Sequence, residues 1–321
     1  MGGKFEKIVY EEKKYYMIAI VLCLLFAITA CHNSTGKRNA SLDTITNRNQ
    51  WPQKKEISEK NDAHKSETDK PDEYVISGIK EYRGFSVDNV LHTKSGEAIH
   101  YNVYIPKRYD GKEAYALYFT LPGYQGLYFQ GAAENIKTEE FGFEAQKYNH
   151  KMIVVAPQLE DWGETSANQT IELVEYFLKN YNIDKKKVYA SGYSGGGETM
   201  SLVMGKRPEL FTAYLQCSSK WDGAYDTVVK SRTPVYFAVG ENDEYYGSKP
   251  LKKAYNTLYK LYRKQGLSNK EIEQLLVLDV KSADYFTSHG ITNQHDGGGA
   301  LFAKDADIMG WLFNNKNQRK K

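Results

Sequence analysis

The sequence contains few cysteines: there are three in 321 residues, and two of them, Cys23 and Cys31, lie in or directly after an apolar stretch near the N-terminus. Cys217 is the third, and a single thiol cannot form an intramolecular disulfide. We expect Cys217 to be a small buried residue rather than a nucleophile. Stability must then come from the size of a hydrophobic core, and a chain of this length can bury one.

An excess of charge of one sign is also missing. Lysine and arginine together number 43 and aspartate and glutamate 40, which gives a net charge of +3. A surface that binds nucleic acid concentrates positive charge on one face, so we expect no nucleic-acid partner. No cluster of cysteine, histidine and carboxylate residues has the spacing of a zinc site, and we expect no metal.

The N-terminal apolar run is too short to favour a membrane span. It covers residues 17–30, whereas a spanning helix needs roughly 20 apolar residues. Lysines precede it, as in a signal peptide, and it ends in Ile28-Thr29-Ala30-Cys31. This ending resembles a bacterial lipobox, which implies that a signal peptide of residues 1–30 is removed and that Cys31 carries a lipid. An uncleaved N-terminal anchor helix is the alternative.

Either interpretation exports the remaining chain and predicts a protein on the outer side of a bacterial cell membrane, or a secreted one. Residues 31–73 are polar and mixed in charge, with few apolar side chains. Such a segment cannot bury enough surface to offset its ordering entropy. We therefore expect a flexible, lipid-anchored tether followed by a folded domain over residues 74–321.

The folded part begins with β-rich sequence and then alternates strands with helices. Residues 74–109 resemble an antiparallel hairpin or meander. After them we expect strands at residues 116–121, 152–156, 187–191, 211–217, 234–239 and 275–280, and helices at residues 141–149, 168–181, 195–206, 249–265, 268–274 and 301–314. This alternation predicts an α/β fold, with a mostly parallel central sheet, helices on both of its faces and an antiparallel N-terminal edge.

One stretch marks a candidate catalytic serine. Gly192-Tyr193-Ser194-Gly195-Gly196 follows a predicted strand and opens a predicted helix. Glycines on both sides allow a sharp turn that exposes the Ser194 hydroxyl. A glycine-rich structural connection is the alternative, whereas a phosphate loop is excluded because no Lys-Ser or Lys-Thr pair follows the glycines.

A catalytic serine needs a base and an oriented acid, and in an open α/β sheet both come from loops at the carboxyl ends of strands. Asp243 follows the strand at residues 234–239, and Glu241, Glu244 and the more distant Asp222 are its rivals. For the base we favour His295, which precedes the final predicted helix and is followed by three glycines that would let the imidazole reach Ser194. His289, closer to the strand, remains the alternative.

An oxyanion hole is the remaining requirement. The backbone N–H of Gly195 is one expected donor, and the loop after the strand at residues 116–121 should supply the other. That loop reads Leu121-Pro122-Gly123-Tyr124. We expect the main chain of Tyr124 to be the second donor.

Residues 80–315 resemble the α/β-hydrolase family, and most of all its secreted esterase branch, which includes feruloyl esterases, acetyl-xylan esterases and polyhydroxyalkanoate depolymerases. The residues that carry the resemblance are Gly192 to Gly196, Gly240 to Asp243, Gln294-His295, Leu121 to Tyr124 and the closing Met309-Gly310-Trp311-Leu312-Phe313. The order Ser194, Asp243, His295 is also that of the family. The chain departs from the family pattern at two places. It has Pro122-Gly123 where the family usually has His-Gly, and Gln294-His295 where the family usually has Gly-His.

The resemblance implies hydrolysis of an ester or similar acyl bond through an acyl-enzyme, with no organic cofactor. An exported, tethered esterase suits an ester-bearing small molecule or polymer, such as an acylated polysaccharide. A serine peptidase of the same fold is the nearest alternative. A catalytically inert lipoprotein that uses the fold to bind a surface partner is a third.

Overall fold

The computed structural model describes residues 73–314. The predicted signal peptide, Cys31 and the tether lie outside this range. Among residues 73–314, no helix combines the length and the apolar character that crossing a bilayer requires.

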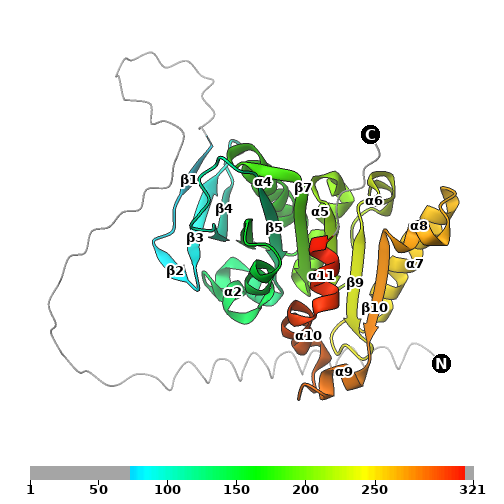
Figure 1. Cartoon of the computed structure of the whole chain (residues 1–321). Coiled ribbons are helices and arrows are strands. Elements are labelled where there is room, and N and C mark those ends of the chain that lie inside the picture. The colour runs from blue at the N-terminus through cyan, green and yellow to red at the C-terminus, as the bar shows by residue number, and fades with distance from the viewer. Residues whose placement is uncertain (1–72, 315–321) are drawn as a thin grey trace, which may run out of the picture. The chain divides into compact units, whose positions relative to one another are not determined.

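A ten-stranded mixed sheet forms the centre of the domain (Figure 1). Its strands are β1 (Tyr74–Ile76), β2 (Lys80–Tyr82), β3 (Phe85–His92), β4 (Ala98–Tyr104), β5 (Tyr115–Leu121), β6 (Met152–Gln158), β7 (Ile183–Tyr193), β8 (Ala213–Cys217), β9 (Val235–Gly240) and β10 (Leu276–Lys281). The order across the sheet is β1-β3-β4-β6-β5-β7-β8-β9-β10, and β2 pairs with β3. Strands β1 to β4 pair antiparallel, as does β4 with β6, whereas β6, β5, β7, β8, β9 and β10 are parallel. The predicted fold class, including its antiparallel N-terminal edge, is confirmed.

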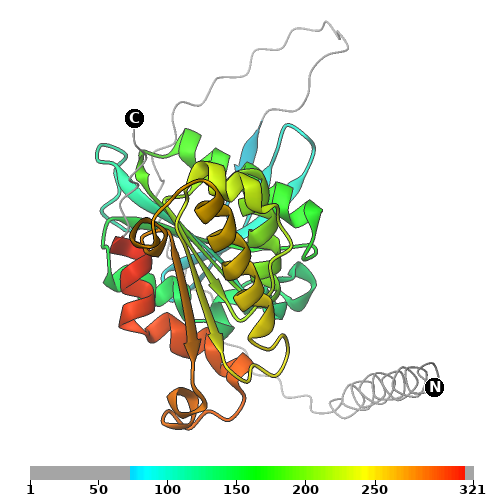
Figure 2. The same ribbon diagram turned by 90° about the vertical axis from the view of Figure 1, so that its right-hand side faces the viewer.

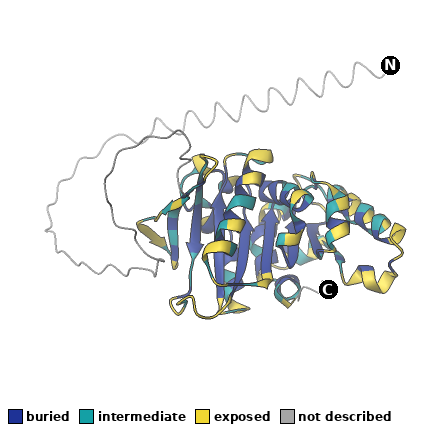
Figure 3. Ribbon diagram, turned by 90° about the horizontal axis from the view of Figure 1, so that it is seen from above, coloured by how far each residue is buried: buried dark blue, intermediate teal, exposed yellow. Residues whose placement is uncertain are grey.

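Helices cover both faces of the sheet, because the central strands are apolar on both sides. Leu117, Phe119 and Leu121 of β5 pack into one core cluster, and Ala116 and Tyr118 pack into the other. The first cluster includes residues of α4 (Glu164–Asn180), α5 (Gly195–Lys206), α6 (Tyr225–Ser231), α7 (Lys249–Lys264) and α8 (Asn269–Glu273). The second includes residues of α2 (Glu134–Thr138), α3 (Phe141–Glu144), α9 (Ala283–Thr287), α10 (Gln294–Lys304) and α11 (Ala306–Asn314). Figure 2 shows the red helices α10 and α11 on one side of the strands and the yellow α7 on the other, and Figure 3 shows the strands buried between them.

The parallel strands bring the loops of the candidate site together. In the register of the sheet, Leu121 at the end of β5 lies beside Gly192 of β7, and Lys281 at the end of β10 lies beside Gly240 of β9. The segments that follow β5, β7, β9 and β10 therefore leave the sheet at the same edge.

Two predicted helices differ from those found. The helix predicted at residues 141–149 is α3 followed by a 3₁₀ turn at Ala145–Lys147. The helix predicted at residues 301–314 is two helices, α10 and α11, which are separated at Asp305. Asp305 Oδ1 accepts the N–H groups of Asp307 and Ile308, at 3.0 and 3.2 Å, and so caps a new helix start. Helices α2, α6 and α9 had not been predicted.

Candidate active site

The turn at Ser194 joins β7 directly to α5. Ser194 has φ 52° and ψ −126°, a strained conformation for a residue with a side chain. Its neighbours must be glycines for steric reasons. A Cβ on Gly192 would lie 2.7 Å from the carbonyl oxygen of Gly196, and a Cβ on Gly196 would lie 2.2 Å from that of Leu121. The sequence thus specifies a tight turn that presses against the end of β5.

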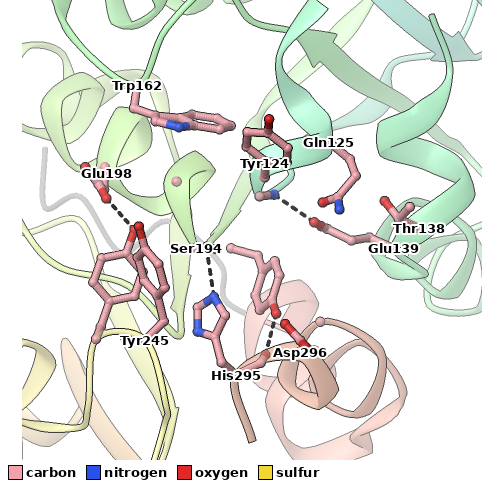
Figure 4. Close-up of a pocket in the computed structure, with 15 residues that line it drawn as sticks. Tyr124, Gln125, Thr138, Glu139, Trp162, Ser194, Glu198, Tyr245, His295 and Asp296 are labelled. Carbon is pink, nitrogen blue, oxygen red and sulfur yellow. Dashed lines mark hydrogen bonds between the residues drawn. The ribbon is translucent and has the colours of Figure 1, made fainter. Parts of the chain in front are cut away.

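Three side chains predicted to act together lie in one hydrogen-bonded chain. Ser194 Oγ is 3.0 Å from His295 Nε2, a contact drawn in Figure 4, and His295 Nδ1 is 2.9 Å from Asp243 Oδ2. The Asp243 side chain is fully buried. Its other oxygen, Oδ1, accepts the backbone N–H groups of Tyr245 and Tyr246 at 3.1 and 2.8 Å. The Asp243 carboxylate is therefore fixed on both oxygens.

Electrostatics keep this acid ionised. Burial by itself raises the pKa of Asp243, but the hydrogen bond and charge of His295 and the N–H of Tyr246 outweigh it and hold the pKa below its ordinary value. An ionised Asp243 can hold the His295 ring with Nε2 toward the serine and stabilise the imidazolium that forms when His295 accepts a proton.

The rival residues lie elsewhere. His289 is exposed, and its Nδ1 lies 2.7 Å from the carbonyl oxygen of Tyr285. Glu241 accepts the N–H of Ala283, and Asp222 pairs with Lys220. Glu244 is nearer, but its carboxylate accepts the backbone N–H of His295 rather than the ring. The structure brings only Asp243 and His295 of these candidates into line with Ser194.

The glycines after His295, which were expected to let the imidazole reach Ser194, do not form a loop. They are buried within α10, where His295 occupies the first turn. A Cβ on Gly299 would lie 3.2 Å from the Tyr193 ring, so this glycine lets α10 pack against the end of β7. The Tyr193 hydroxyl in turn donates to the carbonyl oxygen of His295. A packed helix, rather than a mobile segment, therefore positions the imidazole.

Gln294, at which the chain departs from the family pattern, is also a residue of the site. Its side chain is buried, and its Oε1 accepts the backbone N–H of Asn242 at 2.8 Å. It thereby ties the residue before His295 to the residue before Asp243. The sequence signal was the glutamine itself, since a long amide next to the base can reach across to the acid loop.

The two predicted oxyanion donors border the same cavity as Ser194. This cavity measures about 420 Å³, and its lining includes Tyr124, Ser194, Gly195 and His295. Within residues 73–314, no acceptor is bonded to the backbone N–H of Tyr124 or Gly195. Both N–H groups are thus free to bind an oxyanion.

The cavity wall is aromatic and acidic. Its aromatic residues are Tyr124, Trp162, Tyr193, Tyr245 and Tyr246, and its carboxylic acids are Glu139, Glu198 and Asp296 (Figure 4). None of the described residues that line the cavity is a lysine or an arginine. Glu198 is paired with Lys220 at 3.1 Å and accepts the hydroxyl of Tyr246. Over residues 73–314, no group of three or more histidine, cysteine or acidic side chains is arranged to hold a metal ion.

Comparison with known proteins identifies the fold. A solved structure of a thermostable esterase superposes with a TM-score of 0.59 at 20% identity, over 73% of this chain and 63% of the esterase. The domain has the α/β-hydrolase fold. The chain spans less than two thirds of that esterase, so the comparison concerns the shared domain alone.

Further comparisons match parts of the chain. Residues 158–271 match the sequence profile of the prolyl oligopeptidase family. Est1E from Butyrivibrio proteoclasticus superposes with a TM-score of 0.46 at 15% identity, over 68% of this chain and 95% of Est1E. Oligopeptidase B from Leishmania major superposes with a TM-score of 0.48 at 14% identity, over 72% of this chain and 36% of the oligopeptidase. No curated protein matches the sequence significantly.

Proposed function

We propose that this protein is a serine hydrolase that cleaves a carboxylic ester through an acyl-enzyme. The observation that carries the proposal is the hydrogen-bonded chain from Ser194 through His295 to buried Asp243. A serine hydroxyl is a weak nucleophile unless a base takes its proton, and this arrangement supplies the base and the anion that orients it.

The proposed reaction has two halves. Ser194 Oγ attacks the ester carbonyl carbon while its proton passes to His295 Nε2. The C–O bond to the alcohol then breaks, and the alcohol leaves with that proton. Water attacks the acyl-enzyme in the same way and releases the acid, with Ser194 regenerated. The N–H groups of Gly195 and Tyr124 are assigned to the oxyanion of each tetrahedral intermediate.

The cavity lining supports a neutral substrate. A carboxylate such as Asp296, with no lysine or arginine among the lining residues, disfavours an anionic acyl group, whereas exposed aromatic rings at the mouth, such as Tyr124 and Tyr245, suit stacking on a sugar or phenolic ring. Together with the lipobox-like ending at Cys31, this favours an acylated polysaccharide outside a bacterial membrane. The similarity to a thermostable esterase supports an ester substrate.

A peptide bond is the second candidate, because residues 158–271 match the prolyl oligopeptidase profile. The same three side chains could cleave an amide, with His295 protonating the leaving amine. The two candidates differ in the substrate that is turned over, so one panel distinguishes them.

The test compares the purified chain with Ser194→Ala and with Ser288→Ala, an exposed serine, as the matched control. The panel contains p-nitrophenyl acetate and butyrate, methyl ferulate, acetylated xylan and a peptide p-nitroanilide. We expect wild type and Ser288→Ala to hydrolyse an ester and to react with a fluorophosphonate probe, and Ser194→Ala to lose both activities. Cleavage of the anilide with no ester turnover would favour the peptidase, and silence of the wild type toward every substrate and the probe would refute the hydrolase.

A further inference from the structure

Glu139 is a buried carboxylic acid that the proposed chemistry does not use. It follows α2, is 7% exposed and lies beside the cavity, with its carboxyl group directed toward the loop after β5 (Figure 4). Its Oε1 accepts the backbone N–H of Gly123 at 2.7 Å. Its Oε2 is buried and has no hydrogen-bond partner within residues 73–314. A buried polar atom without a partner is costly, so this arrangement calls for an explanation.

Among the residues that the structure describes, no cation near Glu139 balances a negative charge. The titratable groups that face it are Tyr118 of β5, Tyr193 of β7 and Cys217 of β8, and burial raises the pKa of each. On its own segment, Lys137 pairs with Glu134 and the neighbouring Glu140 pairs with Arg83. Across the cavity lie His295 and Asp296.

Burial consequently dominates, and it raises the pKa of Glu139 to about 8 in spite of the hydrogen bond from Gly123. Below that pH the group is mostly a neutral acid, and it ionises as the pH rises through that value. The neutral form can occupy the buried position at much lower cost than a carboxylate.

Gly123 is the residue directly before the assigned oxyanion donor. Its carbonyl oxygen accepts the N–H of Gly126 at 2.8 Å, and its own N–H is held by Glu139. The preceding Pro122 has no N–H with which to anchor the loop. Glu139 is therefore the one side chain among the described residues that is bonded to the main chain of Gly123, at the entry to the peptide that carries the Tyr124 N–H.

We propose that Glu139 is a positioning residue for the oxyanion hole: by accepting the Gly123 N–H it holds the loop so that the N–H of Tyr124 points at the carbonyl bound over Ser194. This rests on the proposed function. Its neutral acid form is the active one, because a carboxylate behind the loop would repel the negative charge that develops on the substrate oxygen.

This role has two parts, accepting the Gly123 N–H and remaining uncharged, and substitutions can separate them. Glu139→Gln keeps an oxygen that can accept the Gly123 N–H and cannot ionise. Glu139→Ala removes the acceptor. Glu140→Gln is the matched control, since it changes a carboxylate at the next position that is bonded to Arg83 and not to the loop. All three are made in the full chain and compared with wild type by kcat and KM for p-nitrophenyl butyrate from pH 6 to 10, with the Ser194→Ala rate subtracted.

We expect Glu139→Ala to lower kcat about 10- to 100-fold with KM changed less than threefold, because a displaced oxyanion donor costs transition-state rather than substrate binding. Wild type and Glu140→Gln should lose kcat at alkaline pH with an apparent pKa near 8, and Glu139→Gln should keep a kcat near that of wild type at pH 7 and retain it at pH 9. Circular dichroism and thermal unfolding verify that the variants are folded.

Several results would overturn the inference. One is a Glu139→Ala variant with wild-type kcat, and another is an effect confined to KM. A third is a loss of kcat at alkaline pH that is the same in wild type and Glu139→Gln. This third result would overturn the inference even if Glu139→Ala does not fold. A wild type that hydrolyses nothing would overturn the proposed function and this inference together, whereas an active wild type with an unchanged Glu139→Ala overturns this inference alone.

Discussion

The acid–base side of Ser194 and the entry to the oxyanion loop are held in place by different numbers of side-chain hydrogen bonds. On the acid–base side, Asp243 is bonded through both carboxylate oxygens, and His295 is held at its ring, its backbone N–H and its carbonyl oxygen. At the entry to the loop after β5, by contrast, one side chain is bonded to the main chain of Gly123, and it is Glu139, a buried acid with one unpartnered oxygen.

This difference suggests that the two sides respond differently to change. A group held by several side-chain bonds keeps its geometry when one of them is lost, whereas a loop entry held by one side chain should respond to a single substitution or to a change in the protonation of that side chain. The base must keep its alignment through two proton transfers, and the larger number of side-chain hydrogen bonds lies on the acid–base side. Substitutions on each side test the comparison.

The largest effect is expected from Asp243→Asn, on the acid–base side. The asparagine keeps an oxygen for the N–H groups of Tyr245 and Tyr246, but its NH₂ would face His295 Nδ1 and favour the wrong tautomer. We expect kcat to fall roughly 10³- to 10⁴-fold. Steady-state kinetics on the preferred ester measure this, with the exposed Asp226→Asn as the control. A loss below tenfold would show that Asp243 is not the acid.

A smaller effect is expected from Gly196→Ala, on the oxyanion side. The added Cβ would lie 2.2 Å from the Leu121 carbonyl oxygen and 2.3 Å from that of Pro122, so the end of β5 must move. We expect kcat to fall about 10²-fold, as for the loss of one oxyanion donor, together with a lower melting temperature. Gly310→Ala is the control, because its Cβ would meet nothing closer than 3.9 Å. Equal kcat values for the two alanine variants would contradict the close packing of the turn against β5.

Gln294→Ala should have a milder effect, because it removes one of the several side-chain hydrogen bonds on the acid–base side. The partly buried N–H of Asn242 would lose its acceptor, which costs about 0.5–1.5 kcal/mol of stability. His295 keeps its contacts with Asp243, Glu244 and Tyr193, so we expect kcat to fall only about three- to tenfold. Urea unfolding and steady-state kinetics measure the two quantities, with the exposed Thr292→Ala as the control. A fall beyond 10²-fold would show that the acid–base side depends on a single bond as well.

The sequence was informative where local pattern decides structure. Alternating apolar strands and helices predicted the sheet, and the helix predicted at residues 268–274 is present as α8, with a capping box formed by Ser268 and Glu271. The glycines that flank Ser194 predicted the turn, because no other residue fits there. Asp243 was the preferred acid because it follows a strand end.

Tertiary packing determines the features of the site that local sequence pattern does not predict. His289 and His295 both follow β10, and their separation depends on how α9 folds, which local pattern does not show. The glycines after His295 have low helix propensity, about 1 kcal/mol each below alanine, and yet they are helical because α10 packs closely against Tyr193. Likewise nothing local distinguishes buried Glu139 from its neighbour Glu140.

Lys281→Met should lower the stability of the fold and leave kcat almost unchanged. It therefore distinguishes contacts that stabilise the fold from contacts that align the site. Lys281 Nζ lies 2.9 Å from both Asp279 and Asp305, and these side chains are 17%, 21% and 11% exposed. Removing the cation leaves two half-buried carboxylates unpaired, so we expect the free energy of unfolding at pH 7 to fall by about 2–4 kcal/mol. The exposed Lys112→Met, which breaks a pair with Asp110, should leave the free energy of unfolding almost unchanged, because water and salt screen such a pair.

The pH dependence of this effect has a definite sign. Burial raises the pKa of Asp305, but the bond to Lys281 and the N–H of Ile308 outweigh it and lower the pKa below its ordinary value. The stabilisation is therefore present above the ordinary carboxyl pKa and is lost as the pH falls through the lowered one. Urea unfolding at pH 7 and pH 3 should show the difference between wild type and Lys281→Met shrinking in acid. If kcat instead fell tenfold at pH 7, the junction of α10 and α11 at Asp305 would have to count among the contacts that align His295, and the acid–base side would extend further than its own hydrogen bonds.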